Sequence, residues 1–136
     1  MFPLRIAAAC SLLLLASAAG AASGSYGADA AGQAVHARNV YYYAHFAVPP
    51  ATPADGRISG VSYRWQFSAQ PEDLRVYLCL GSQCLDVSTQ PQGSSDAFNG
   101  ARPSQPFRLK YQLPGRGGMA PLFPGRQQLA VSYTLP

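Results

Sequence analysis

The strongest constraint on the fold is a pair of alternating segments on either side of Gly81-Ser82, each carrying one cysteine. Residues 74–80 alternate apolar and polar side chains, and residues 85–88 alternate again. A period of two is typical of β-strands with one buried face. Glycine at the first central position favours a two-residue type II′ turn. The sequence therefore predicts a β-hairpin in which Cys79 stands directly opposite Cys84.

This register divides the predicted hairpin into an apolar face and a polar face, with the cysteines on the polar one. Leu80 would pair with Gln83, next to the turn. Each remaining pair then joins residues of the same kind, which supports the alignment. The pairs are Leu78 with Leu85 and Val76 with Val87 on the apolar face, and Tyr77 with Asp86 and Arg75 with Ser88 on the polar face.

The two cysteines are predicted to form a structural disulfide. As the first pair beyond the turn they form a non-hydrogen-bonded pair, whose Cα atoms lie about 4.5 Å apart, within the range that a disulfide spans. The alternatives are a redox pair or a metal site. A redox pair prefers two intervening residues, whereas four separate Cys79 from Cys84. A structural zinc ion needs four ligands, and only His36 and His45 could complete the set.

The remainder of the chain predicts further strands and no helix. Strand-like alternation recurs in four segments, and residues 89–106 between two of them are rich in turn-forming residues and are expected to form a long loop. The 13 glycines and 12 prolines suit strands and turns better than helices. We predict an all-β fold, a small antiparallel β-sandwich or barrel of about six strands with one hairpin disulfide. The four segments are residues 35–48, 58–67, 107–113 and 129–135.

The N-terminal segment is typical of a secretory signal peptide. Arg5 precedes an Ala- and Leu-rich run, and small residues follow it that fit an A-x-A cleavage site. The alternative, a membrane anchor, needs about 20 strongly apolar residues, and this run is shorter and mostly alanine. We therefore expect a signal peptide over residues 1–21, no stable membrane anchor after cleavage, a flexible segment over 22–34 and a single β domain over 35–136.

Composition and motifs argue against several classes of function. The net charge is +4, and no two basic residues are adjacent, so the basic stripe of a nucleic-acid-binding protein is missing. The sequence has no G-x-S-x-G nucleophile elbow. Adjacent carboxylates at Glu72 and Asp73 would point apart, unlike a glycosidase pair. We predict no enzymatic activity, small-molecule substrate, cofactor or metal, and expect His36 and His45 to be ordinary strand or surface residues.

Two groups of aromatic residues could belong either to the core or to a binding surface. Trp65 is expected in the core, flanked by Tyr63 and Phe67 on the same face, rather than as a sugar-binding platform. An exposed tyrosine within the run Tyr41-Tyr42-Tyr43 could mark a binding surface, and buried or edge packing is the alternative.

Beyond these local features, the chain resembles the flagellar protein FlhE family from Ile58 to about Tyr133. Each motif is short, and their order and spacing carry the resemblance. The motifs are Gly60-Val61, Tyr63-Arg64-Trp65-Gln66-Phe67, Leu74-Arg75-Val76, the Cys79-to-Cys84 hairpin, Ala97-Phe98, Pro103, Pro106-Phe107-Arg108, Pro114-Gly115, Arg126 and Val131-Ser132-Tyr133.

The resemblance implies a small, non-enzymatic periplasmic β-protein that assists flagellum assembly. Members of the family are thought to act at the export gate, to limit proton leakage through the export channel, and to exert chaperone-like control over assembly. The implied partners are flagellar export-gate or rod proteins, with contacts expected on basic residues of the polar strand faces. An alternative is a secreted inhibitor of the lysozyme-inhibitor type, for which residues 89–106 would supply the inserted loop. The expected contact residues are Arg64, Arg75, Arg108 and Lys110.

Overall fold

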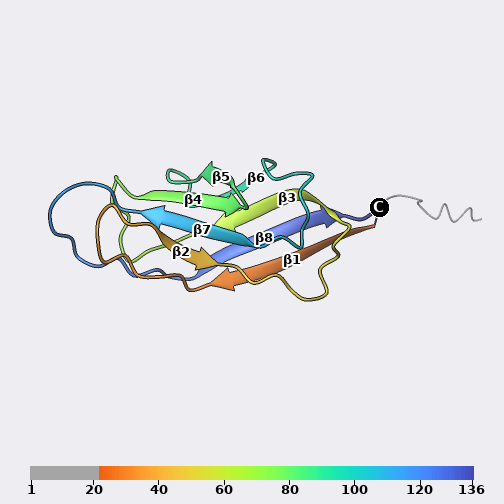
Figure 1. Cartoon of the computed structure of the whole chain (residues 1–136), viewed down its shortest axis with the longest axis horizontal. Helices are drawn as coiled ribbons and strands as arrows, with labels where there is room; N and C mark the ends of the chain where they lie inside the picture. The colour runs from red at the N-terminus through yellow and green to blue at the C-terminus, as the bar shows by residue number, and fades with distance from the viewer. Residues whose placement is uncertain (1–21) are drawn as a thin grey trace, which may run out of the picture.

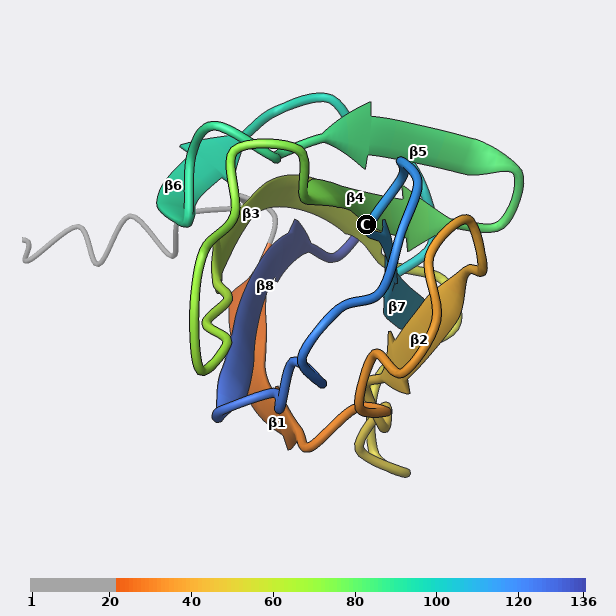
Figure 2. The same ribbon diagram turned by 90° about the vertical axis from the view of Figure 1, so that its left-hand side faces the viewer.

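The protein, described here for residues 22–136 by a computed structural model, is built from β-strands alone. Figures 1 and 2 show two curved layers of strands that enclose a core. Within residues 22–136 no helix is long and apolar enough to cross a bilayer. The predicted signal peptide, residues 1–21, lies outside the described residues. The strands are β1 (Ser23–Ala30), β2 (Tyr42–His45), β3 (Arg57–Arg64), β4 (Arg75–Leu80), β5 (Gln83–Asp86), β6 (Gln92–Ser95), β7 (Phe107–Gln112) and β8 (Gln127–Thr134).

The eight strands form two four-stranded antiparallel sheets. The first has the order β1-β8-β3-β6 and the second the order β2-β7-β4-β5. The predicted antiparallel β-sandwich is thus confirmed, with two strands more than the six expected. The additional strands, β1 and β6, are both edge strands of the first sheet.

Strand β1 corrects the expectation of a flexible segment over residues 22–34. Ser23–Ala30 pair along their whole length with β8, from Ser23 opposite Thr134 to Ala30 opposite Gln127. The segment consists of small and polar residues except for Tyr26, whose side chain is buried. Because one large side chain makes no alternation, the sequence pattern did not indicate a strand here.

Strand β6 corrects the expectation of an uninterrupted loop over residues 89–106. Gln92–Ser95 pair with the second half of β3. The segment after β6 also packs against the body of the domain, because Phe98 and Pro103 are fully buried. The backbone N–H of Gly100 donates a hydrogen bond to the Ile58 carbonyl at 2.9 Å.

The strand expected over residues 35–48 is shorter in the structure. Only Tyr42–His45 form β2, while Val35 makes an isolated bridge to Leu122. Asn39 lies between them with φ of 65°, a left-handed conformation that interrupts extended backbone. The expected faces are confirmed within β2, since Ala44 is buried and His45 points outward.

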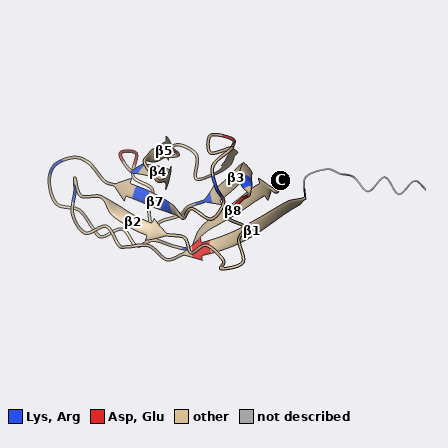
Figure 3. Ribbon diagram, turned by 45° about the vertical axis from the view of Figure 1, so that its right-hand side comes forward, with Lys and Arg blue, Asp and Glu red and all other residues tan. Residues whose placement is uncertain are grey.

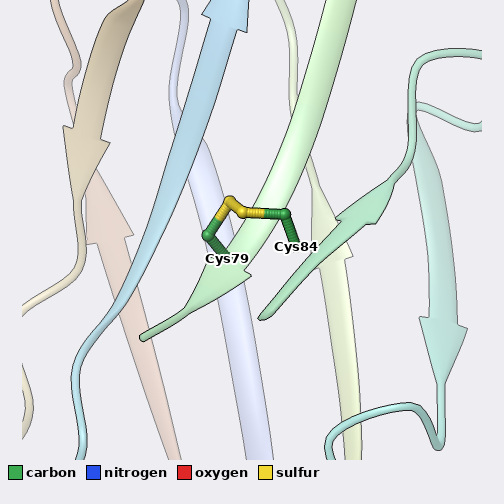
Figure 4. Close-up of a disulfide and its surroundings, with 2 residues drawn as sticks. All are labelled: Cys79 and Cys84. Carbon is green, nitrogen blue, oxygen red and sulfur yellow. A yellow bond between two sulfur atoms is a disulfide. The ribbon is translucent and has the colours of Figure 1, made fainter. Parts of the chain in front are cut away.

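The hairpin has the predicted register, with Leu80 opposite Gln83 and Cys79 opposite Cys84. Gly81 has φ of 59° and Ser82 does not have a positive φ, the combination required by a type II′ turn. The two cysteines form the predicted disulfide across the strands, with Cα atoms 4.1 Å apart (Figure 4). Local sequence therefore determined this part of the fold.

We expect removal of the disulfide to lower the free energy of unfolding by about 2 kcal/mol, because the closed loop is only six residues long. The double variant Cys79→Ala/Cys84→Ala should stay folded, with a lower urea midpoint and an unchanged circular dichroism spectrum. The reduced wild-type protein is the control and should show a similar decrease. Complete unfolding of both proteins without denaturant would contradict this prediction.

The core lies between the sheets and is rich in aromatic side chains. Trp65, which follows β3, is 2% exposed, and its indole Nε1 donates a 3.0 Å hydrogen bond to the Val87 carbonyl after β5. Its ring lies 5.8 Å from that of Phe67, which meets Tyr111 of β7 edge-on at 4.8 Å between ring centroids. The expectation that Trp65 is a core residue is confirmed, and its hydrogen bond joins the two layers.

One buried polar side chain holds the segment that leaves β3. Gln127, at the start of β8, is fully buried. Its Oε1 accepts a hydrogen bond from the Gln66 backbone N–H at 2.8 Å, and its Nε2 donates to the Gln66 carbonyl at 2.7 Å. The side-chain amide thus replaces a backbone partner where the β3–β8 pairing ends at Arg64.

Candidate functional site

The most distinctive surface is the outward face of the sheet β2-β7-β4-β5. Strand β7 alternates strictly, so that Phe107, Leu109 and Tyr111 are buried while Arg108 and Lys110 point away from the core. Apart from Cys79, the outward side chains of β2 and β4 are aromatic or charged as well. We call this surface the aromatic–basic face; it consists of Tyr41, Tyr43, His45, Arg75, Tyr77, Arg108 and Lys110.

The strand register places each basic residue of β7 beside at least one aromatic neighbour. Lys110 stands opposite Tyr43 of β2 on one side and Tyr77 of β4 on the other. Arg108 likewise stands between His45 and the disulfide-bonded Cys79. Directly opposed residues have Cβ atoms about 4.5–5.5 Å apart, so these side chains form one continuous surface.

Cation–π contacts hold the basic side chains along the sheet. The Lys110 Nζ lies 4.2 Å from the centroid of the Tyr41 ring, and the Arg108 Cζ lies 6.0 Å from that of Tyr43. The Tyr43 ring also stacks on the His45 ring, with centroids 5.9 Å apart. Such contacts are worth about 0.5–1 kcal/mol each at exposed sites, and they leave the hydrogen-bond donors of both cations available.

The face has a net positive charge. Asp86 is opposite Tyr77, and it accepts hydrogen bonds from the Ser88 Oγ at 2.6 Å and the Ser88 N–H at 2.9 Å. These bonds hold the pKa of the Asp86 carboxyl below its usual value, and the Arg75 charge lowers it further. Within residues 22–136 the single ion pair joins Arg126 to Asp29 of the other sheet. Arg75, Arg108 and Lys110 therefore lack a paired carboxylate among the described residues.

The structure brings together three of the four basic residues expected to make contacts. Arg75, Arg108 and Lys110 lie on adjacent strands of one sheet, whereas Arg64 of β3 lies in the other sheet (Figure 3). Arg64 is exposed between the inward-facing Tyr63 and Trp65. Its side chain is thus directed away from the aromatic–basic face.

Both interpretations of the tyrosine run hold for different members. Tyr41 is 42% exposed and Tyr43 is half-buried, and both belong to the aromatic–basic face. Tyr42 points inward, where its ring lies 6.4 Å from that of Tyr111. Alternation within the run was visible in the sequence, but its position beside Lys110 depends on the pairing of β2 with β7, which no local pattern indicates.

The opposite outward face, that of β1-β8-β3-β6, contains a shallow depression in which half of the lining residues are small. Its charged groups include Arg64 and Asp29, the latter paired with Arg126 at 2.6 Å between Nη2 and Oδ2. This face thus has fewer aromatic groups than the first. The small residues that line it include Gly27, Ala28, Ser62, Gly93, Ser94 and Ala130.

Neither histidine is placed for metal binding in the described part of the chain. His36 is exposed beside the isolated bridge at Val35, and His45 belongs to the aromatic–basic face. Among residues 22–136 no group of three histidine, cysteine, aspartate or glutamate side chains could hold a metal ion. The chemistry that this arrangement offers is recognition through cations and aromatic rings.

Comparisons with known proteins identify related chains. A solved crystal structure of FLHE has the same fold, with a TM-score of 0.74 and 24% identity over 83% of this chain and 98% of that one. Flagellar protein FlhE of Escherichia coli K12 is 35% identical and that of Salmonella typhimurium LT2 is 30% identical, each over 60% of this chain. The matched segment spans 63% of the length of these relatives. The model of the family "Flagellar protein FlhE" matches residues 31–134, and the chain therefore belongs to this family.

Proposed function

We propose that this protein is a periplasmic accessory protein of flagellum biogenesis that binds export-gate or rod proteins and limits proton leakage through the export channel. The observation that carries the proposal is the family match over residues 31–134. The signal-peptide pattern of residues 1–21 supports export to the periplasm. In this role the protein acts by binding and by chaperone-like control of assembly, without catalysing a reaction.

The aromatic–basic face supports a binding role. Tyrosine and arginine are enriched in protein–protein interfaces, where they supply large contact areas and directional hydrogen bonds. The face presents both residue types on a sheet whose β4–β5 hairpin is crosslinked by the disulfide. A preorganised surface of this kind loses little conformational entropy when a partner binds.

The inhibitor alternative requires a protruding loop at residues 89–106. Instead, this segment contains β6, and its Phe98 and Pro103 side chains are buried. The Ile58 N–H donates a 2.8 Å hydrogen bond to the Ala101 carbonyl, which ties the segment to β3. These contacts favour the flagellar proposal over insertion into an enzyme cleft.

The proposed function is tested by an in-frame deletion in the bacterium that encodes this chain. We expect impaired swimming and a more acidic cytoplasm in acidic medium, measured with a ratiometric pH-sensitive fluorescent protein. Both defects should be reversed by the wild-type gene, and the acidification should disappear when the flagellar export channel is also deleted. Unchanged swimming and cytoplasmic pH, together with strong inhibition of lysozyme by the purified protein, would contradict the proposal.

A further inference from the structure

We infer that the aromatic–basic face binds an acidic segment of a partner protein, one that presents carboxylates together with an aromatic or aliphatic side chain. This inference rests on the proposed function only in taking the partner to be a protein. It adds the chemistry of the partner and the residues that recognise it.

Charge complementarity is the first argument. Arg75, Arg108 and Lys110 face solvent on adjacent strands, and the ion pair within residues 22–136 uses none of them. Arginine binds carboxylates through two parallel N–H···O bonds, and such charge-assisted bonds are about twice as strong as neutral ones. Asp86, near Arg75, offsets part of this positive charge. An acidic segment would therefore supply counter-charges for the remainder.

The spacing of the cations suits an extended segment. Arg108 and Lys110 are two residues apart on β7, which corresponds to about 6.8 Å along an antiparallel strand. Alternate carboxylates of an extended partner have the same repeat, so each can reach one cation. Arg75 on the neighbouring β4 could bind a third carboxylate or a backbone carbonyl.

Apolar contacts are available at the β2 side of the face. Tyr41 is 42% exposed and lies under the Lys110 ammonium group. An aromatic or aliphatic side chain between the carboxylates of the partner would cover this exposed surface. The predicted ligand is thus acidic and partly apolar, not simply polyanionic.

A membrane and a second copy of the chain are both disfavoured as occupants. Anionic lipid surfaces are bound by clusters of about four to eight basic residues, whereas this face has three and also carries the ionised Asp86. Two copies meeting face to face would bring the three cations of one copy near the three of the other, which is unfavourable. A separate acidic protein fits the face better.

The test measures binding of a fluorescein-labelled peptide in which glutamates alternate with serine and phenylalanine. The full chain is expressed in cells, and the purified protein is titrated against the peptide by fluorescence anisotropy. We expect saturable binding that weakens as the NaCl concentration is raised. A control peptide in which every glutamate is replaced by glutamine should bind at least roughly tenfold more weakly, because it lacks the charge-assisted contacts.

Matched variants localise the binding. Arg75→Gln/Arg108→Gln/Lys110→Gln should weaken binding roughly tenfold or more. Arg57→Gln/Arg64→Gln/Arg102→Gln removes the same charge from exposed positions outside the aromatic–basic face and should leave binding unchanged. Both triple variants should keep the wild-type circular dichroism spectrum and a cooperative thermal transition, which excludes misfolding as the cause. Equal weakening in the two variants would overturn the inference, because it would reflect net charge alone.

Further outcomes identify other occupants. Binding of wild-type protein to phosphatidylglycerol vesicles, lost in the first variant and accompanied by no peptide binding, would replace the inference with a membrane site. A dimer seen by sedimentation in wild type but not in that variant would replace it with self-association.

Full complementation of the deletion by the first variant would refute a role for the face while leaving the proposed function intact. If the purified protein binds the peptide but the deletion strain has no phenotype, the inference about the face stands and the proposed function is refuted.

Discussion

Replacing Trp65 with alanine is expected to lower the free energy of unfolding by about 3–5 kcal/mol. The indole is 2% exposed between the two sheets, so its removal leaves a large cavity. It also removes the 3.0 Å hydrogen bond to the Val87 carbonyl, an interaction that joins β3 to the end of β5. Because domains of this size are stable by only about 5–15 kcal/mol, much of the variant should be unfolded at moderate urea concentrations.

Urea denaturation followed by circular dichroism measures this effect, since Trp65 is the single tryptophan of the chain and its fluorescence is lost with it. Trp65→Phe separates the two contributions, because it keeps part of the packing and loses the hydrogen bond. Phe123→Ala, at an aromatic side chain that is 57% exposed, is the control and should change stability little. A decrease below about 1 kcal/mol for Trp65→Ala would contradict the assignment of Trp65 as the link between the layers.

Replacing Gln127 with alanine should lower the free energy of unfolding by about 2–4 kcal/mol, a large effect for a polar residue. The substitution leaves the Gln66 N–H, in a part-buried bond, without its acceptor at 2.8 Å, and the loss of such a partner costs up to about 1–3 kcal/mol. The Gln66 carbonyl keeps a second bond, from the Gly125 N–H at 3.0 Å, so the loss is partial on that side. The empty space left by a fully buried side chain adds the remainder.

The neighbouring residue provides the control for this prediction. Gln128 is only half-buried and faces outward on the same strand, so Gln128→Ala should change the urea midpoint little. Amide hydrogen exchange gives a local readout, since the Gln66 amide should exchange faster in Gln127→Ala. Similar midpoints for the two variants would show that the amide bridge does not stabilise the fold.

The sequence predicted those parts of the fold in which large side chains make a visible pattern. The hairpin register and the inward faces of β3, β7 and β8 followed from alternation, because most inward positions carry a bulky apolar residue, with Gln127 of β8 as a polar exception. Strands β1 and β6 have small residues and were missed. Their pairing depends on backbone hydrogen bonds to β8 and β3, which leave no signature in side-chain size.

The candidate site was predictable only in part for a related reason. Alternation showed that Arg64 and Lys110 point away from the core, but it did not show which strands are neighbours. The structure places β7 between β2 and β4, and places β3 in the other sheet. These pairings join segments far apart in the sequence, so the grouping of Tyr43 with Lys110 required the three-dimensional structure.

The arrangement of β1 has a consequence for how the chain matures. In the described part of the chain β1 pairs only with β8, so β1 cannot pair until residues 127–134 have been synthesised. Contacts of such long sequence separation slow the search for the native topology. We expect the nascent polypeptide to complete the sheet β1-β8-β3-β6 only after β8 has left the ribosome.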